Sequence, residues 1–81
     1  SLHDALPILI GKNCKIGKNV VIDNGTVIGN NVIIQDDAII KDSIIWDNVV
    51  IGKHARLYFS IVNIKVPNRL SVYNGLLFNI I

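Results

Sequence analysis

His54 and Cys14 are the side chains of this 81-residue chain best suited to chemistry. A histidine can act as a general base when a partner orients it, and a thiolate can act as a nucleophile or metal ligand. However, His54 occupies a repeated position that asparagine fills elsewhere, and Cys14 a position filled by small apolar residues. The only other histidine is His3, too few for a zinc site with three histidines. We therefore expect a solvated corner histidine, an inert packed thiol and no metal site.

Lysines and glycines could instead bind a phosphate or a nucleic acid. Gly11, Gly17, Gly29 and Gly52 form no phosphate-binding motif and are spaced for chain corners. Lys+Arg is 8 and Asp+Glu is 6, and the resulting net charge of +2 gives no electrostatic case for nucleic acid. Lys12, Lys18 and Lys53 are therefore expected to form a solvated edge.

Composition excludes further classes of protein. No apolar run approaches the ~18 residues of a membrane span, so we expect no membrane partner. A single cysteine rules out an internal disulfide and is compatible with the cytoplasm. The abundance of Ile, Val and Asn favours short strands and turns, hence an all-β fold.

Aliphatic residues recur every six positions and organise the chain. This period fits short strands joined by tight corners, with one side of a coil per unit. Residues two positions earlier share the same strand face and point into the same core. We expect Ile16, Ile34 and Ile51 to stack in one almost fully buried column. The recurring positions begin as Ile10, Ile16, Ile22, Ile28, Ile34 and Ile40.

Two later units, Ile40 to Ile45 and Leu57 to Val62, are one residue short and lie one coil apart. Their alignment predicts an inward hydroxyl ladder of Thr26, Ser43 and Ser60. The corners carry residue types that accept a positive φ angle, which a sharp corner needs. These predicted corner residues are Asn13, Asn19, Gly25, Asn31, Asp37 and His54.

Residues just before each aliphatic position point outward, and one such column is wholly apolar. It contains Val27, Ile44 and Ile61, with aromatic residues near it in sequence. A contiguous apolar column with aromatics indicates a surface that another protein covers. Strand propensity alone would also favour Val and Ile on an outer face. The predicted interface residues are Val27, Ile44, Ile61, Trp46, Tyr58 and Phe59.

The repeat divides the chain into three parts. Residues 9–62 carry the regular repeat, and residues 63–81 are expected to form an irregular last coil or cap. In that tail Val66, Val72 and Phe78 are predicted to face the core, with Leu70 and Leu76 two positions earlier. Residues 1–8 do not fit the repeat and resemble a translated sequencing adapter, so we expect a non-native or frayed leader. With no Met at position 1, we expect a piece of a longer protein.

The motif aliphatic-Gly-x-x-small-x, as in Ile16–Val21 and Ile28–Ile33, resembles the hexapeptide-repeat family over roughly residues 9–62. The resemblance implies a left-handed parallel β-helix of triangular section, here of about three to four coils. The left hand comes from the resemblance alone, because crossovers between parallel strands are otherwise right-handed. Ser43-Ile44-Ile45-Trp46 and Ser60-Ile61-Val62 resemble the C-terminal domain of sugar-nucleotide pyrophosphorylases, of the mannose-1-phosphate guanylyltransferase or glucose-1-phosphate nucleotidyltransferase type.

This narrower resemblance implies a non-catalytic domain that serves assembly or regulation of a cytoplasmic enzyme of NDP-sugar biosynthesis. The implied partners are an N-terminal catalytic domain, which uses Mg²⁺, and further copies in a homo-oligomer. The glycine-rich loop and metal-binding aspartate of that domain have no counterpart here, so no catalytic, cofactor or metal residue is carried over. Two alternatives stay open. One is part of a hexapeptide acyltransferase using acetyl-coenzyme A. The other is the β-helix of a gamma- or epsilon-type subunit of the initiation guanine-nucleotide exchange factor.

Overall fold

The computed structural model describes residues 6–23 and 25–79, and every regular element in these ranges is a short β-strand. The β-branched residues that fill these strands have stiff side chains that favour extended backbone. The strands are β1 (Leu9–Ile10), β2 (Lys15–Ile16), β3 (Val21–Ile22), β4 (Val27–Ile28), β5 (Ile33–Ile34), β6 (Ile39–Lys41), β7 (Ile44–Ile45), β8 (Val50–Ile51), β9 (Arg56–Tyr58), β10 (Ile61–Val62), β11 (Ser71–Tyr73) and β12 (Leu76–Leu77).

All strand pairs are parallel, and they form three sheets that run along the molecule. The first sheet has the order β1-β4-β7-β10-β12, the second β2-β5-β8 and the third β11-β9-β6-β3. Val66 extends the second sheet by a single parallel bridge to Ile51. Consecutive strands thus belong to different sheets, as expected for a solenoid with three strands per coil.

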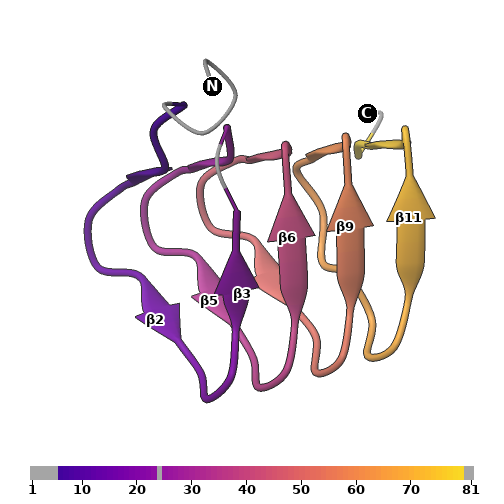
Figure 1. Cartoon of the computed structure of the whole chain (residues 1–81), viewed down its shortest axis with the longest axis horizontal. Coiled ribbons are helices and arrows are strands. Elements are labelled where there is room, and N and C mark those ends of the chain that lie inside the picture. The colour runs from indigo at the N-terminus through magenta and orange to yellow at the C-terminus, as the bar shows by residue number, and fades with distance from the viewer. Residues whose placement is uncertain (1–5, 24, 80–81) are drawn as a thin grey trace.

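The solenoid contains about four coils and winds in the left-handed sense. In Figure 1 the chain advances from left to right while β3, β6, β9 and β11 run upward on the near side. The chain then crosses over the top to the far side, which gives a left-handed coil. The all-β, left-handed parallel β-helix expected from the resemblance is confirmed.

Coil length falls from the N-terminal to the C-terminal end. Register partners in adjacent coils are first 18 residues apart, then 17 and finally 15. The step to 17 is the short unit recognised in the sequence, and the step to 15 comes from the four-residue spacing between Val62 and Val66.

The inward aliphatic residues form the core in columns one coil apart. Ile16, Ile34 and Ile51 are register partners, as predicted. The predicted burial holds for Ile34, which is 1% exposed, and is wrong for Ile16, which is 44% exposed. Ile16 lies in the first coil and is covered from one side only. Cys14 and Val20 share this end position and are only partly buried against the core.

The hydroxyl ladder of Thr26, Ser43 and Ser60 is confirmed, and all three side chains are fully buried. The Ser43 backbone N–H donates to Thr26 Oγ1 at 3.4 Å, and the Ser60 N–H donates to Ser43 Oγ at 3.1 Å. The Gly75 N–H continues the ladder to Ser60 Oγ at 3.1 Å. The side-chain oxygens therefore satisfy buried backbone donors at the shortened corner, where leaving them unpaired would be costly.

The predicted corner residues all have a positive φ angle. Asn13, Asn19, Asn31, Asp37 and His54 lie between 58° and 63°, and Gly25 is at 83°. Asp42, Phe59 and Asn74 show the same left-handed backbone at the shortened corner, at 48°, 51° and 55°. A left-handed backbone costs roughly 1–2 kcal/mol for most residues and least for Gly, Asn and Asp. Phe59 is therefore an unfavourable choice for its corner.

Close contacts between coils, rather than positive φ angles, account for most of the corner glycines. Gly25 alone among the described glycines has a positive φ. A Cβ on Gly29 would instead overlap Asp47 Oδ1, an oxygen that accepts a hydrogen bond from Asn30 N at 2.7 Å. The same arrangement pairs Gly11 with Asn30, Gly17 with Asp36, and Gly52 with Asn68.

Two corners without glycine agree with this pairing. Gln35 and Trp46 directly follow an inward aliphatic residue, where the other corners have glycine. The residue of the next coil that would supply the cap is Lys53 for Gln35 and Ile64 for Trp46. Neither of these side chains can accept a hydrogen bond. Glycine is thus required where an Asn or Asp side chain of the next coil caps the backbone beside it.

The tail follows the repeat more closely than expected, but in a different register. Leu77 is the partner of Val62 and packs against the core, whereas Leu76 points outward and is 72% exposed. The prediction that Leu76 and Phe78 face the core is wrong, because Asn74-Gly75 repeats the shortened corner of the two preceding coils. Val66 is fully buried, as predicted, whereas Val72 is partly buried and Leu70, also predicted to face the core, is exposed at the C-terminal end.

Most of the predicted leader, residues 1–5, lies outside the described residues. Within residues 6–8, the Pro7 carbonyl accepts a hydrogen bond from Gly25 N at 3.1 Å.

Truncating the central core should cost far more than truncating its end. Ile34→Ala should lower the free energy of unfolding by about 2–5 kcal/mol, because it leaves a cavity at a fully buried site. Ile16→Ala, the same change in the same column, should cost less than half as much. Urea unfolding of both variants measures the difference, and equal losses would contradict the end effect.

The glycine pairing predicts an asymmetry between two corner substitutions. Gly29→Ala should destabilise the chain by roughly 1–3 kcal/mol, because the new methyl overlaps Asp47. Gln35→Ala, at the equivalent place of another corner, should change stability by less than about 0.5 kcal/mol. Thermal melting of the two variants tests this, and a harmless Gly29→Ala would show that the cap can shift aside.

Candidate functional site

The outer face of the first sheet carries a continuous column of apolar side chains. Backbone register aligns Val27 with Ile44, and Ile44 with Ile61. Leu9 and Leu76 extend the column by one strand at each end. We call these five residues the apolar strip. Four of them are exposed and Ile61 is partly exposed, so the strip lies on the surface.

A hollow of about 410 Å³ opens beside the apolar strip, at the end of β7. We call it the Trp46 hollow. The Trp46 side chain is 49% exposed, and its ring centroid lies 5.2 Å from that of Phe78, with the planes tilted by 52°. The Phe78 ring therefore supports the indole from one side. The residues lining the hollow are Val27, Gly29, Ile44, Ile45, Trp46, Asp47 and Asn63.

The Trp46 hollow combines an apolar lining with one acidic group. Asp47 Oδ1 accepts the hydrogen bond from Asn30 N, and the structure records no ion pair for this carboxylate within residues 6–23 and 25–79. Asn63 Oδ1 accepts a hydrogen bond from Asn79 N at 2.9 Å. Among the described residues, no Lys, Arg or His lines the hollow. The hollow is therefore apolar and acidic.

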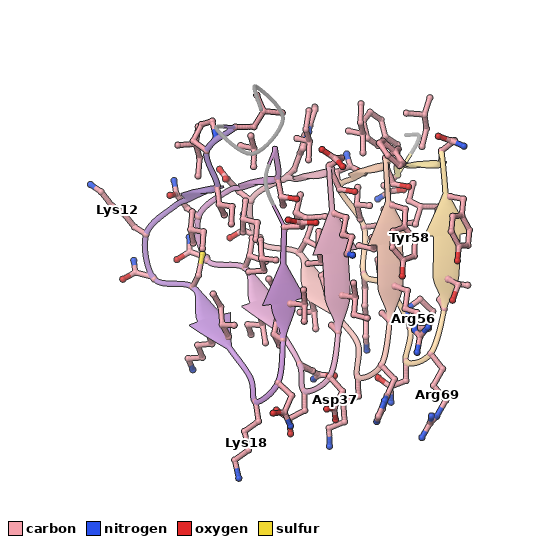
Figure 2. The ribbon with its side chains drawn as sticks, in the orientation of Figure 1. Lys12, Lys18, Asp37, Arg56, Tyr58 and Arg69 are labelled. Carbon is pink, nitrogen blue, oxygen red and sulfur yellow. The ribbon has the colours of Figure 1, made fainter. Side chains whose placement is uncertain are left out.

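The structure separates the other two predicted interface aromatics. Phe59 lies at the corner between β9 and β10, where its side chain is 61% exposed. Tyr58 lies on the third sheet and stacks on Tyr73, with ring centroids 4.7 Å apart and planes 12° from parallel. Figure 2 shows Tyr58 above Arg56 on the near side. Val27, Ile44, Ile61 and Trp46 thus lie together, Phe59 borders them, and Tyr58 belongs to another face.

Sequence reasoning missed several residues of this surface. Leu9 was missed because the outward column was begun at Val27, although Leu9 directly precedes the recurring Ile10. Leu76 and Phe78 were missed because the tail was assigned to another register. The five-residue step from Val72 to Leu77, which repeats the two earlier short units, was the available signal. Asp47 and Asn63 carried no signal in the sequence, since Asn and Asp fill corners throughout the chain.

The residues first considered for chemistry lie away from the apolar strip. His54 is an exposed corner residue, and its Nε2 lies 3.5 Å from Asp37 Oδ2. Cys14 Sγ donates to the Gly29 carbonyl at 3.2 Å. No group of three or more His, Cys, Asp or Glu that could hold a metal occurs in the described part of the chain. His54 lines neither the Trp46 hollow nor the second hollow described below.

The lysines occupy the corners as predicted. Lys12, Lys18 and Lys53 are all exposed, and Figure 2 shows Lys12 and Lys18 extending away from the ribbon. A second hollow, of about 230 Å³, lies on the second sheet and contains both basic and acidic groups, including Lys15, Lys53 and Asp36. Its mixed charge distinguishes it from the Trp46 hollow.

Residues 6–23 and 25–79 contain no helix long and apolar enough to span a membrane.

Comparison with known proteins agrees with the repeat found in the sequence. The family model of the GMPPB C-terminal domain matches residues 5–71, which is most of the chain and includes the apolar strip up to Ile61. No curated protein matches the chain. The chain therefore belongs to the GMPPB C-terminal domain family, the hexapeptide-repeat β-helix of sugar-nucleotide pyrophosphorylases.

Proposed function

We propose that this chain is the non-catalytic assembly domain of a sugar-phosphate nucleotidyltransferase. The parent reaction joins a sugar 1-phosphate to a nucleoside triphosphate and releases pyrophosphate, with Mg²⁺ held by the N-terminal catalytic domain. The β-helix supplies a docking surface for that domain and supports a homo-oligomer in the cytoplasm. The family match favours this function over an acyltransferase.

The apolar strip is the observation that carries the proposal. Folding does not require it, because the outer columns of the other sheets include charged residues, Lys15 on β2 and Arg56 on β9. The strip places five large aliphatic side chains on one sheet face, with register fixed by the backbone. Exposed apolar patches of this kind mark protein interaction sites.

The strip also has suitable anchors at its edges. Trp46 and Phe59 are large exposed aromatics, and Trp and Phe are both enriched in the cores of protein interfaces. Phe59 keeps a left-handed backbone that Asn adopts more easily, and Asn74 occupies the same corner one coil later. Strained residues that persist in proteins cluster at functional sites. A role in docking explains why Phe59 is present at a position where it disfavours folding.

The strip can be tested with a pair of lysine substitutions. Ile44→Lys should leave the fold of the 81-residue chain unchanged, because Ile44 points outward. In the full-length nucleotidyltransferase it should weaken docking or oligomerisation, seen as a smaller species in sedimentation and a lower melting temperature. Ile33→Lys is the matched control, since Ile33 is an equally exposed isoleucine on the second sheet. An unchanged oligomer and melting temperature in the Ile44→Lys protein would leave strand propensity as the explanation of the strip.

Phe59 provides an independent test through opposite effects on folding and assembly. Phe59→Asn should stabilise the 81-residue chain by about 1 kcal/mol, because Asn tolerates the left-handed backbone. The same substitution should weaken the assembled full-length protein. Chemical unfolding of the isolated chain and sedimentation of the assembly measure the two effects. An assembly that is unchanged by Phe59→Asn would remove Phe59 from the docking surface.

A further inference from the structure

We propose that the Trp46 hollow receives an arginine side chain from the domain that docks on the apolar strip. This proposal rests on the assembly function above and specifies the chemistry of its partner. It starts from the charge of the hollow, because Asp47 is a carboxylate among apolar groups with no ion-pair partner in the described part of the chain. If docking covered Asp47 with apolar groups alone, it would bury an unpaired charge, at a cost of several kcal/mol.

The side chain of Asp47 contributes two things that can be separated, a capping oxygen and a negative charge. Its Oδ1 caps the Asn30 N–H, and Asn30, Asn68 and Asp36 make the same cap at other corners. An asparagine is therefore sufficient for the fold at such a position. The negative charge of Asp47 is not needed for the cap, and it lies where a partner would cover it.

The lining of the hollow favours arginine over lysine. Trp46 offers an exposed indole, on whose face a planar guanidinium stacks. The free Asp47 Oδ2 and the second lone pair of Asn63 Oδ1 offer two acceptors within one hollow. Five N–H donors in a flat fork can serve two acceptors while the ring stays stacked. The aliphatic part of the arginine side chain would cover Val27 and Ile44.

The second hollow provides an internal contrast. Asp36 caps Lys18 N in the same way as Asp47 caps Asn30 N, but Lys15 and Lys53 line the same hollow as Asp36. Cations of this chain therefore already line the hollow that contains Asp36, although none of the described residues forms an ion pair with it. The two aspartates share a structural role and differ in whether the chain supplies a positive charge, so Asp36 is a matched control.

The first test uses Trp46 as its own reporter, because it is the only tryptophan in the chain. The 81-residue chain is titrated at constant ionic strength with N-acetyl-L-arginine amide, and separately with the citrulline analogue, which has a similar shape and no charge. We expect a saturable change in Trp46 fluorescence with the arginine compound, at about tenfold lower concentration than with the citrulline compound.

Asp47→Asn should abolish this preference for arginine without changing the melting temperature, and Asp36→Asn should retain it. Equal responses to the two compounds, no saturable response, or an Asp47→Asn protein that still prefers arginine would each overturn the proposal. The retained melting temperature matters, because a variant that lost the Asn30 cap would lose binding for a trivial reason.

A second test separates failure of this proposal from failure of the assembly function. In the full-length protein, Asp47→Asn should weaken the docking of the partner domain on the apolar strip about tenfold. Asp36→Asn should leave this docking unchanged. If Ile44→Lys weakens docking and Asp47→Asn does not, the arginine site is wrong and the apolar docking surface stands. If neither substitution changes docking, the assembly function itself fails.

Discussion

The solenoid depends on the hydrogen bonds that join each coil to the next at its corners. Strands of two or three residues make few ladder hydrogen bonds, so the corner backbone must also be satisfied. Side-chain oxygens of Asn and Asp do this across coils, as when Asn30 accepts from Lys12 N and Asn68 accepts from Lys53 N. The oxygen lies where a Cβ on the residue below would be, so the residue below is glycine. One hydrogen bond between coils thus determines two residue types a full coil apart.

This constraint shows why much of the fold could be predicted from the sequence. Spacing of Ile16, Ile34 and Ile51 defines an inward column, and the loss of one residue before Ser43 and Ser60 defines the hydroxyl ladder. Both features are local regularities repeated along the chain. Glycine at Gly29 was also recognised, but its cause could not be found from the sequence. The close approach of Asp47 is a contact between coils, which the spacing of residues within the sequence does not report.

The failures share a physical origin at the two ends of the solenoid. Burial of Ile16 depends on whether a coil lies on each side of it, which spacing within the chain does not report. The tail register depended on Asn74-Gly75 acting as a short corner. A six-residue step from Val72 leads to Phe78, and a five-residue step leads to Leu77, so the sequence was compatible with two registers. The structure has the second register, in which Leu77 packs against the core. The outer surface was predicted where it followed the regular coils, at Val27, Ile44 and Ile61, and missed at Leu9, Leu76 and Phe78.

Because folding is determined by inward columns and corners, the outward residues are free to serve other purposes. Outward side chains of the second and third sheets vary in character, from Lys15 to Ile33 and from Ile39 to Arg56, without disturbing the register. The unbroken apolar character of the first sheet is thus an additional property that the fold does not demand. The same reasoning applies within a corner. Asp47 and Asn68 make equivalent caps, so the cap accounts for the oxygen of residue 47 and leaves its charge unexplained. A charge with no role in folding, beside an apolar strip and an exposed indole, is best accounted for by a partner that brings the opposite charge.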